Sequence, residues 1–202
     1  MLTLFHAPRS RSSRLVWLIE ELGADCRIEY CDIQRMDGTG ARDPRNPHPD
    51  GKVPALVHDG ALISESAAVA LYLTGLHPEA GLGFPPESPQ RGPLLTWICW
   101  TAGELEPAIW SKASGATQTD PRALERYEAA MARLLEALWV GPCLMGDTFT
   151  VADVMIGSTL AWAREHLPES PLIDDYLGRL QARPAHQRAM ARDDGMIRSE
   201  AA

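Results

Sequence analysis

The sequence predicts a chain of two parts, an α/β domain followed by an all-helical domain. Over residues 1–76, strand-like and helix-like segments follow one another in the order β-α-β and then, after a loop, β-β-α. Residues 77–87 are dense in proline and glycine, which is typical of a linker. Every periodic segment after this linker has helical spacing. We therefore expect residues 88–202 to form the helical domain.

Composition indicates a globular protein without affinity for polyanions. Of 202 residues, 45% are hydrophobic, the formal net charge is −8 and the pI is about 5.2. An acidic balance gives no general basic field, so we expect neither nucleic acid nor membrane as a partner. The chain has no apolar run of about 18 residues and begins without a signal-like segment. We expect a soluble, cytoplasmic protein.

The cysteines and histidines do not predict a metal site. The four cysteines contain no C-x-x-C pair and do not alternate with histidine at zinc-ligand spacing, and the six histidines are scattered. We expect free thiols, most of them buried, and no bound metal.

Within the first domain, residues 1–6 alternate weakly, as a strand does, and a helix follows that ends at Gly23. Four apolar residues mark one face of this helix: Leu15, Leu18, Ile19 and Leu22. Residues 26–33 predict a second strand, which the intervening helix makes parallel to the first. Residues 34–50 are irregular, and residues 53–63 predict a hairpin around an Asp-Gly turn before helical spacing resumes.

Three helices are predicted in the second domain, at residues 94–105, 120–139 and 149–165. The second of them begins with an aspartate cap and a proline in its first position. The third opens on a capping box from Thr150 to Asp153 and is apolar on most sides, so we expect it to be the buried helix. Two shorter helical stretches follow, separated by prolines.

Three places could carry chemistry, and the first is the turn "HAPRSRSSR" after the first strand. Hydroxyls, backbone N–H groups and positive charge before a helix suit an anion. A solvated turn with Ser12 or Ser13 as the helix cap is the alternative. A Ser-His-Asp hydrolase is not supported, because the turn contains no G-x-S-x-G elbow.

The second and third places flank the predicted hairpin. A cis bond before Pro54 would turn the Val53 backbone outward toward an extended ligand, and the alternative is an ordinary trans proline that opens an edge strand. Ser66 is a candidate cap for the next helix, whose start could bind a carboxylate, and Glu65 could bind an ammonium group. The alternative for this pair is a plain cap beside a surface acid. Together the two residues would recognise an α-amino acid head group.

Over essentially its whole length, the chain resembles the glutathione transferases, in the form that has a serine-type N-terminal motif. The segments that carry the resemblance are "PRSRSSRLVWLIEELG", "GKVPALVHDG", "ISES" and "GDTFTVADVMIG". Each segment is weakly specific alone, whereas the P-A-L and E-S pairs at this separation are specific in combination. The resemblance implies a thioredoxin-like N-terminal domain that binds glutathione, followed by an all-helical domain that contributes the electrophile pocket.

The resemblance also implies roles for the hairpin residues. Pro54 would be a cis-proline, and the Val53 backbone would bind the cysteinyl part of glutathione. Ser66, at its helix start, would hold the γ-glutamyl carboxylate, and Glu65 would lie near the amino group. Lys52 is the candidate for the glycine carboxylate.

For the group that activates the thiol, the resemblance implies Ser10, four positions before Arg14, with Ser12 as the alternative. Donors from the backbone, Arg9 or Arg11 could share the task, and Arg11 is also a candidate glutathione-binding residue. The turn contains no tyrosine or cysteine, which disfavours a tyrosine-type or cysteine-type mechanism and a glutaredoxin.

The expected function is therefore transfer of glutathione, a co-substrate bound as thiolate, to a small hydrophobic electrophile. The electrophile pocket is expected among four residues of the helical domain: Trp100, Thr101, Glu104 and Trp110. A homodimer is expected. Two alternatives remain, a glutathione-dependent peroxidase, reductase, isomerase or dehalogenase, and an interaction module that has kept the fold without turnover.

Overall fold

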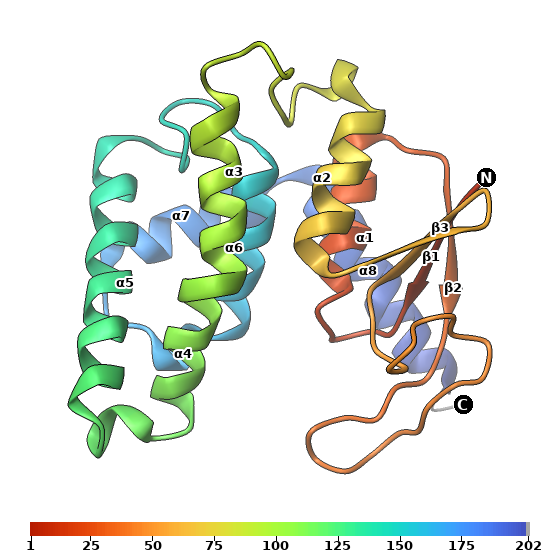
Figure 1. Cartoon of the computed structure of the whole chain (residues 1–202), viewed down its shortest axis with the longest axis horizontal. Coiled ribbons are helices and arrows are strands. Elements are labelled where there is room, and N and C mark those ends of the chain that lie inside the picture. Colours follow the sequence, from red (N-terminus) through yellow and green to blue (C-terminus); the bar gives the residue numbers. More distant parts are fainter. Residues whose placement is uncertain (201–202) are drawn as a thin grey trace. The chain divides into compact units, whose positions relative to one another are not determined.

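The computed structural model describes the backbone of residues 1–200 and the side chains of residues 1–196. Contacts divide the chain into two compact units. Unit 1 contains residues 1–80 together with the C-terminal helix α8 (Pro184–Glu200), and unit 2 contains Gly81–Arg183. Figure 1 shows the sheet of unit 1 and the helices of unit 2.

Unit 1 is built on a four-stranded mixed sheet with the strand order β2-β1-β3-β4. The strands are β1 (Leu2–His6), β2 (Cys26–Tyr30), β3 (Ala55–His58) and β4 (Ala61–Ser64). β1 is parallel to β2 and antiparallel to β3, and β3 and β4 form an antiparallel hairpin. The predicted order of β-α-β followed by β-β-α is confirmed.

Two helices connect these strands, α1 (Ser13–Leu22) and α2 (Ser66–Leu76). The predicted apolar face of α1 is buried, and the helix ends where Gly23 takes a left-handed conformation with φ of 61°. Fully buried leucines of the sheet, Leu4 and Leu56, form a core with Leu15 and Leu18 of this helix. Burial of each such side chain stabilises the fold by about 1.5–3 kcal/mol.

The second strand is shorter than the predicted residues 26–33, because it ends at Tyr30. The chain leaves the sheet where the Asp32 carboxylate accepts hydrogen bonds from the backbone N–H groups of Ile33 and Ala41, at 2.8 Å and 2.7 Å. A side chain that satisfies backbone donors in this way replaces the ladder partners that a longer strand would need.

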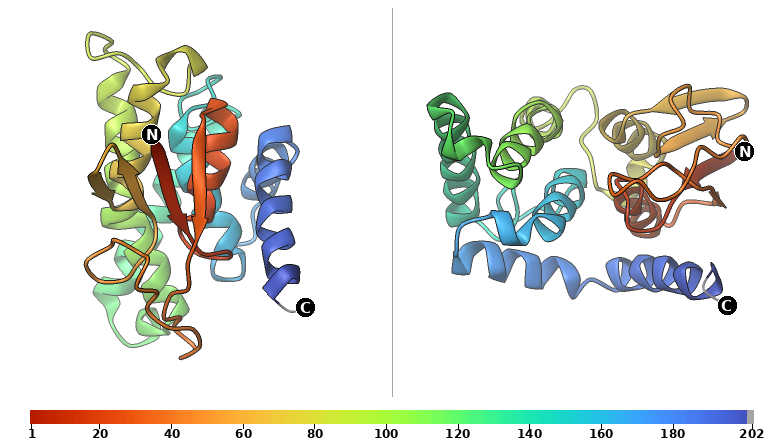
Figure 2. Two further views of the ribbon diagram at one scale, coloured as in Figure 1. Left: turned by 90° about the vertical axis from the view of Figure 1, so that its right-hand side faces the viewer. Right: turned by 90° about the horizontal axis from the view of Figure 1, so that it is seen from below.

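Helix α8 packs along α1, and Figure 2 shows this pair beside the sheet. The helical domain expected at residues 88–202 includes this helix, whereas its contacts group it with unit 1. Its contact with α1 uses small buried residues, Ala185 and Ala189, and two arginines that bind the Glu20 carboxylate. Alanines and charged residues do not produce the strong apolar periodicity by which a core helix is recognised in sequence.

Unit 2 consists of helices joined by short turns. Its α-helices are α3 (Arg91–Trp100), α4 (Glu106–Ala113), α5 (Pro121–Val140), α6 (Val151–Trp162) and α7 (Pro171–Gln181). Short 3-10 turns lie at Pro78–Ala80 in unit 1 and at Ala116–Gln118 and Arg164–His166 in unit 2. A π-helical turn, Thr101–Leu105, joins α3 to α4.

Helix α6 is the buried helix of unit 2, as predicted, and nearly all of its residues from Val151 to Leu160 are buried. The predicted capping box is present. Thr150 Oγ1 accepts from the Ala152 backbone N–H at 3.3 Å, and the Asp153 carboxylate accepts from the Thr150 N–H at 2.8 Å. No helix among the described residues is long and apolar enough to cross a membrane.

Candidate functional site

Strand register brings the three predicted segments to one end of the sheet. Phe5 of β1 lies opposite Ala55 of β3, which in turn lies opposite Ser64 of β4. The turn after β1, the Val53–Pro54 segment before β3 and the start of α2 after β4 therefore all extend from this row. Residues that are distant in sequence share one edge because adjacent strands run in opposite directions.

The Val53–Pro54 peptide bond is cis, which is the isomer implied by the family resemblance. The Val53 side chain is buried in an apolar cluster with Ala7 and Cys31. This packing attaches the segment before β3 to the end of β1. Among the residues that the structure describes, none makes a hydrogen bond with the Val53 backbone. Its N–H can therefore donate to a ligand's backbone, and its C=O can accept from one.

Glu65, not Ser66, is the N-cap of α2, and Ser66 is the first residue of the helix. Glu65 has φ of 69° and ψ of 124°, a conformation that costs a non-glycine residue on the order of 1–3 kcal/mol. Such strain is typical of positions that hold a ligand. No side chain caps this helix, so the first N–H groups of α2 remain available to an anion.

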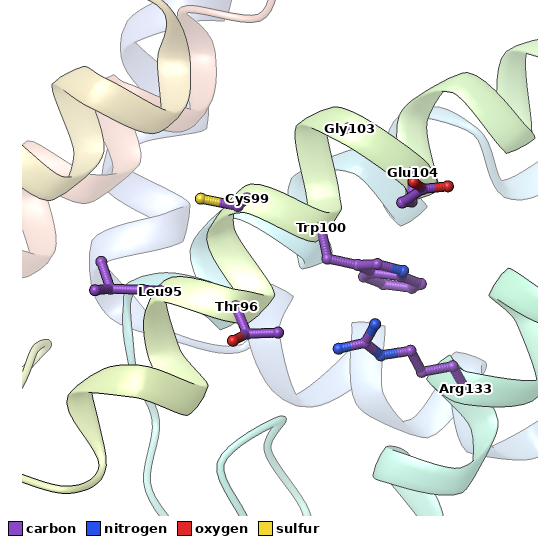
Figure 3. Close-up of a pocket in the computed structure, with 7 residues that line it drawn as sticks. All are labelled: Leu95, Thr96, Cys99, Trp100, Gly103, Glu104 and Arg133. Atoms are coloured by element: carbon purple, nitrogen blue, oxygen red, sulfur yellow. The ribbon is translucent and has the colours of Figure 1, made fainter.

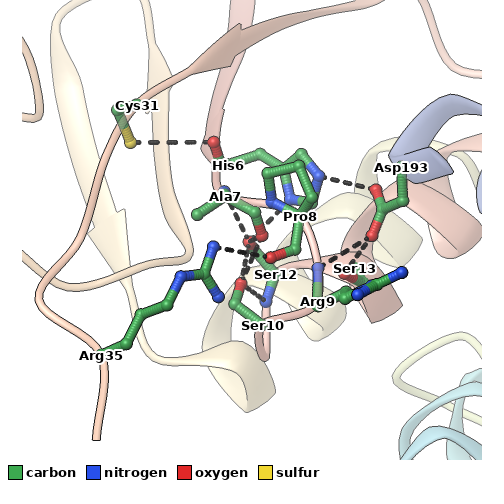
Figure 4. A network of polar contacts seen from close by, with 10 residues as sticks. All are labelled: His6, Ala7, Pro8, Arg9, Ser10, Ser12, Ser13, Cys31, Arg35 and Asp193. Atoms are coloured by element: carbon green, nitrogen blue, oxygen red, sulfur yellow. Dashed lines mark hydrogen bonds and ion pairs between the residues drawn. The ribbon is translucent and has the colours of Figure 1, made fainter. Parts of the chain in front are cut away.

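The turn after β1 contains a chain of hydrogen-bonded hydroxyls (Figure 4). Ser10 Oγ lies 2.7 Å from Ser12 Oγ and 2.7 Å from the Ala7 carbonyl oxygen. Ser12 Oγ lies 2.7 Å from His6 Nδ1 and also accepts from the Ala7 N–H at 3.2 Å. Ser12 is fully buried, whereas Ser10 is half-buried, so only Ser10 can offer its hydroxyl to a ligand at the surface.

The chain of hydroxyls ends on Asp193 of α8. His6 Nε2 lies 2.8 Å from Asp193 Oδ1, while Ser13 Oγ and the Arg9 backbone N–H donate to Oδ2. Burial alone would raise the pKa of Asp193, but the hydrogen bonds from His6 and Ser13 outweigh it and lower that pKa. Sequence reasoning missed both His6 and Asp193, since a histidine within a strand and an acid in a charged segment carry no local signal.

The cationic candidates lie around the same edge. Arg9, Arg11 and Lys52 are exposed, and Lys52 Nζ is 3.7 Å from Asp50 Oδ2. Arg35, which sequence reasoning missed, is half-buried and donates from Nη2 to the Pro8 carbonyl at 3.1 Å. Its guanidinium therefore fixes the position of the turn after β1.

Cys31 is the buried cysteine of the described chain, Cys26 and Cys143 are half-buried, and none of these three thiols is an activated nucleophile. Burial raises the pKa of Cys31, the cysteine packed against Val53, to about 11. Burial raises the pKa values of Cys26 and Cys143 to about 11 as well. These thiols stay protonated at neutral pH, and a protonated thiol is a poor nucleophile.

Unit 2 contains an open cavity of about 500 Å³ lined by α3, the π-helical turn and α5 (Figure 3). Trp100 and Glu104, two of the four predicted pocket residues, line it together with Thr96, Cys99 and Arg133. The Arg133 guanidinium lies over the rings of both Trp97 and Trp100, 4.8 Å and 4.7 Å from their centroids. No sequence pattern marked Arg133, which lies on the charged side of α5.

The other two predicted pocket residues do not line this cavity. Thr101 is fully buried, and its hydroxyl donates to the Trp97 carbonyl at 2.7 Å. Trp110 lies on α4 with 47% of its surface exposed. Thr101 shares the buried face of this segment with Leu94 and Ile98, at ordinary helical spacing, and therefore points away from the cavity.

Comparisons with known proteins show which family the chain resembles. The family model described as "Glutathione S-transferase, N-terminal domain" matches residues 4–81. The chain is 28% identical to disulfide-bond oxidoreductase YfcG of Escherichia coli K12 over 207 aligned positions, which cover 94% of each chain.

Solved structures show the same likeness. A glutathione transferase from Methylococcus capsulatus str. Bath is 30% identical, with a TM-score of 0.81 over 96% of this chain and 99% of the other. A sphingomonad glutathione S-transferase in complex with glutathione is 27% identical, with a TM-score of 0.79 over 95% and 98% of the two chains. The expected thioredoxin-like domain and helical region are therefore confirmed, and the chain belongs to the glutathione S-transferase family.

Proposed function

We propose that the protein is a glutathione transferase that binds glutathione at the edge of unit 1 and holds its sulfur as a thiolate for attack on a small hydrophobic electrophile. The observation that carries this proposal is the strand register that brings three elements to one edge: the unpaired Val53 backbone, the uncapped start of α2 and the hydroxyls of the turn after β1.

Each part of glutathione has a matching group. The Val53 N–H and C=O bind the cysteinyl backbone as a short strand would. The first N–H groups of α2 and the Ser66 hydroxyl bind the γ-glutamyl carboxylate, and Glu65 binds its ammonium group. Lys52 and Arg11, both exposed cations, are the partners for the glycine carboxylate.

Ser10 is the residue we assign to the thiol. A free thiol has a pKa of about 8.5, and lowering it by two units requires roughly 2.7 kcal/mol of preferential stabilisation of the thiolate. A hydrogen bond to a charged group contributes about 1.5–3 kcal/mol. One serine hydroxyl with a backbone N–H at the start of α1 is therefore sufficient.

Trp100 and Glu104 are the residues we assign to binding of the electrophile. The cavity they line has an apolar indole wall with the Arg133 guanidinium over it and the Glu104 carboxylate in the lining, which suits a small aromatic substrate. Thr101 and Trp110 contribute to the fold around this cavity rather than to its wall in this assignment.

Calorimetry of glutathione binding tests the site. Ser66→Ala is expected to weaken binding about 10-fold to 100-fold, because a hydrogen bond to the ligand carboxylate is lost. Ser114→Ala, an exposed serine of unit 2, is the matched control and is expected to bind like the wild type. A wild-type protein that does not bind glutathione would overturn the proposal.

A second candidate is glutathione-dependent disulfide reduction, favoured by the relative named a disulfide-bond oxidoreductase. In that reaction the thiolate attacks a substrate disulfide, and a second glutathione releases the product, so two glutathione molecules are oxidised for each disulfide reduced. Assays with haloaromatics, epoxides, peroxides and a small disulfide, run side by side, distinguish the two. Binding without turnover on any of them would favour an interaction module.

A homodimer in the cytoplasm completes the proposal. The acidic charge and the family resemblance support it, and no nucleic acid, membrane or metal is needed for the proposed reaction.

A further inference from the structure

The hydrogen-bonded chain in unit 1 leads from the half-buried Ser10 hydroxyl to a histidine with no exposed surface. In order, its members are Ser10, Ser12, His6 and Asp193, with successive separations of 2.7, 2.7 and 2.8 Å. Asp193 lies 187 positions from His6 in sequence and comes from α8. The proposed function uses only the first hydroxyl, so the remaining members need an explanation.

Counting donors and acceptors gives the arrangement of these hydrogen bonds that holds when His6 is neutral. The Asp193 carboxylate only accepts, so His6 Nε2 carries a proton and donates it to Oδ1. In a neutral imidazole Nδ1 is then an acceptor, and Ser12 Oγ–H donates to it. Ser12 Oγ in turn accepts from the Ala7 N–H and from Ser10. The Ser10 hydroxyl has a second acceptor, the Ala7 carbonyl oxygen at 2.7 Å, and Ser12 Oγ lies 3.3 Å from the same oxygen. With the Ser10 proton on Ser12 Oγ, both hydroxyl protons point toward His6, and this is the arrangement that a proton relay uses.

We infer that His6 is the acceptor for the thiol proton of bound glutathione, with Ser12 and Ser10 as the relay. This inference rests on the proposed function, which places the sulfur against Ser10. The thiol gives its proton to Ser10, Ser10 gives its own to Ser12, and Ser12 gives its own to His6 Nδ1. Three bonds to hydrogen break and three form, and the net products are a thiolate and an imidazolium. Both hydroxyls are restored.

Among the described residues around the His6 ring, Asp193 is the carboxylate in direct contact with it. From β2, the Tyr30 ring meets the imidazole edge-on with 5.5 Å between centroids, and the Cys31 thiol lies 3.8 Å from the His6 carbonyl. Burial raises the pKa values of both Tyr30 and Cys31, so these groups are neutral. From α8, the Arg192 guanidinium lies near Tyr30, and its positive charge repels a positive charge on His6. Asp193, also from α8, contacts the His6 ring directly. Arg9 contributes its backbone N–H to the same carboxylate.

The competing explanation is that Asp193 merely attaches α8 to the turn after β1. Its second oxygen does accept from Ser13 and Arg9 of that turn. An attachment of this kind would affect the unfolding free energy, and it would leave the protonation state of His6 unchanged when glutathione binds. The two explanations therefore differ in an observable that does not depend on stability.

Nitrogen-15 NMR of the histidine rings in the full chain provides that observable. His6 signals are assigned by difference against His6→Gln. The free protein and its complex with S-methylglutathione, which has no thiol proton, are expected to show a neutral ring protonated on Nε2. The glutathione complex at the same pH is expected to show an imidazolium. A neutral ring in both complexes, or an imidazolium already present in the free protein, would overturn the inference.

Variants supply a second measurement, the pKa of the bound thiol followed by thiolate absorbance. Asp193→Asn keeps the size of the side chain and removes the charge, so this pKa is expected to rise by about one unit, a tenfold shift. Glu20→Gln is the matched control, because it makes the same carboxylate-to-amide change in the α1–α8 contact, where Glu20 binds Arg188 and Arg192. Glu20→Gln is expected to leave the thiol pKa unchanged, and an equal shift in both variants would contradict the relay.

Calorimetry separates failure of the inference from failure of the proposed function. If the wild type and the variants bind both glutathione and S-methylglutathione, and the thiol pKa in Asp193→Asn equals that of the wild type, the relay alone is overturned. Absence of glutathione binding in the wild type would overturn the proposed function and the relay with it.

Discussion

Ser10 and Ser12 stand two positions apart in the same turn, and the structure gives them different environments. Ser12 Oγ is fully buried and in contact with His6, Ala7 and Ser10. Ser10 is the member of the pair with exposed surface. Counting along the sequence could name both serines but could not rank them, because burial of Ser12 depends on a histidine in β1 and an aspartate in α8.

Replacing Ser10 tests its proposed contact with sulfur. Ser10→Ala is expected to raise the pKa of bound glutathione by about 1–2 units and to lower conjugation at neutral pH about 10-fold to 100-fold, because one hydrogen bond to the thiolate is lost. Glutathione affinity should change by less than about threefold, since the peptide contacts remain. Full turnover in Ser10→Ala would remove this serine from the mechanism while leaving the binding site intact.

Asp43, a buried residue of the loop between β2 and β3, gives a pH prediction. Hydrogen bonds from the Arg45 side chain and backbone lower its pKa to about 2. The unfolded value is about 3.9, so the contribution of this carboxylate to stability is complete above about pH 5 and is lost as the pH falls toward 2. Urea unfolding of wild type and Asp43→Asn between pH 7 and pH 3 should show a difference in unfolding free energy that shrinks with acidification. A difference independent of pH would contradict this pKa.

At the scale of elements, the patterns that predicted best were those with a local physical cause. The capping box of α6, the aspartate cap of α5 and the apolar face of α1 are set by residues a few positions apart, and all three are confirmed. The end of β2 and the cap of α2 were predicted less well. They depend on loop carboxylates and on a strained backbone that neighbouring strands impose.

Asp153 and Asp120 both accept hydrogen bonds at a helix start in unit 2, but only Asp153 is buried. Comparing the two therefore tests the effect of burial. Asp153 accepts from the Leu144 and Thr150 N–H groups and from the hydroxyls of Thr150 and Tyr176, so Asp153→Ala leaves four donors without this partner and should cost about 3–5 kcal/mol. Asp120 is exposed and accepts one N–H, from Arg122, so Asp120→Ala should cost about 1 kcal/mol. Chemical denaturation measures both, and equal losses would contradict the role given to burial.

For the whole molecule, the sequence predicted two regions and their secondary structure, and it did not indicate that the last helix contacts α1. Contacts between α8 and α1 join segments more than 160 positions apart through alanines and charged residues. His6 and Asp193 are also far apart in sequence, so no local pattern predicts their contact. Patterns within a window of about 15 residues report on local faces and cannot report such pairings.

The assembly is the prediction that belongs to the whole molecule. We expect sedimentation equilibrium to give twice the chain mass of 22.1 kDa at micromolar concentration, as the family resemblance implies. A single species of 22.1 kDa at every concentration would contradict the homodimer.

A crystal structure of the protein with bound glutathione tests the central claim most directly. We expect the γ-glutamyl carboxylate at the N–H groups that open α2, the cysteinyl backbone hydrogen-bonded to Val53, and the sulfur within about 3.5 Å of Ser10 Oγ. Glutathione bound elsewhere in the chain, or at this edge with its sulfur directed away from the turn after β1, would contradict the account.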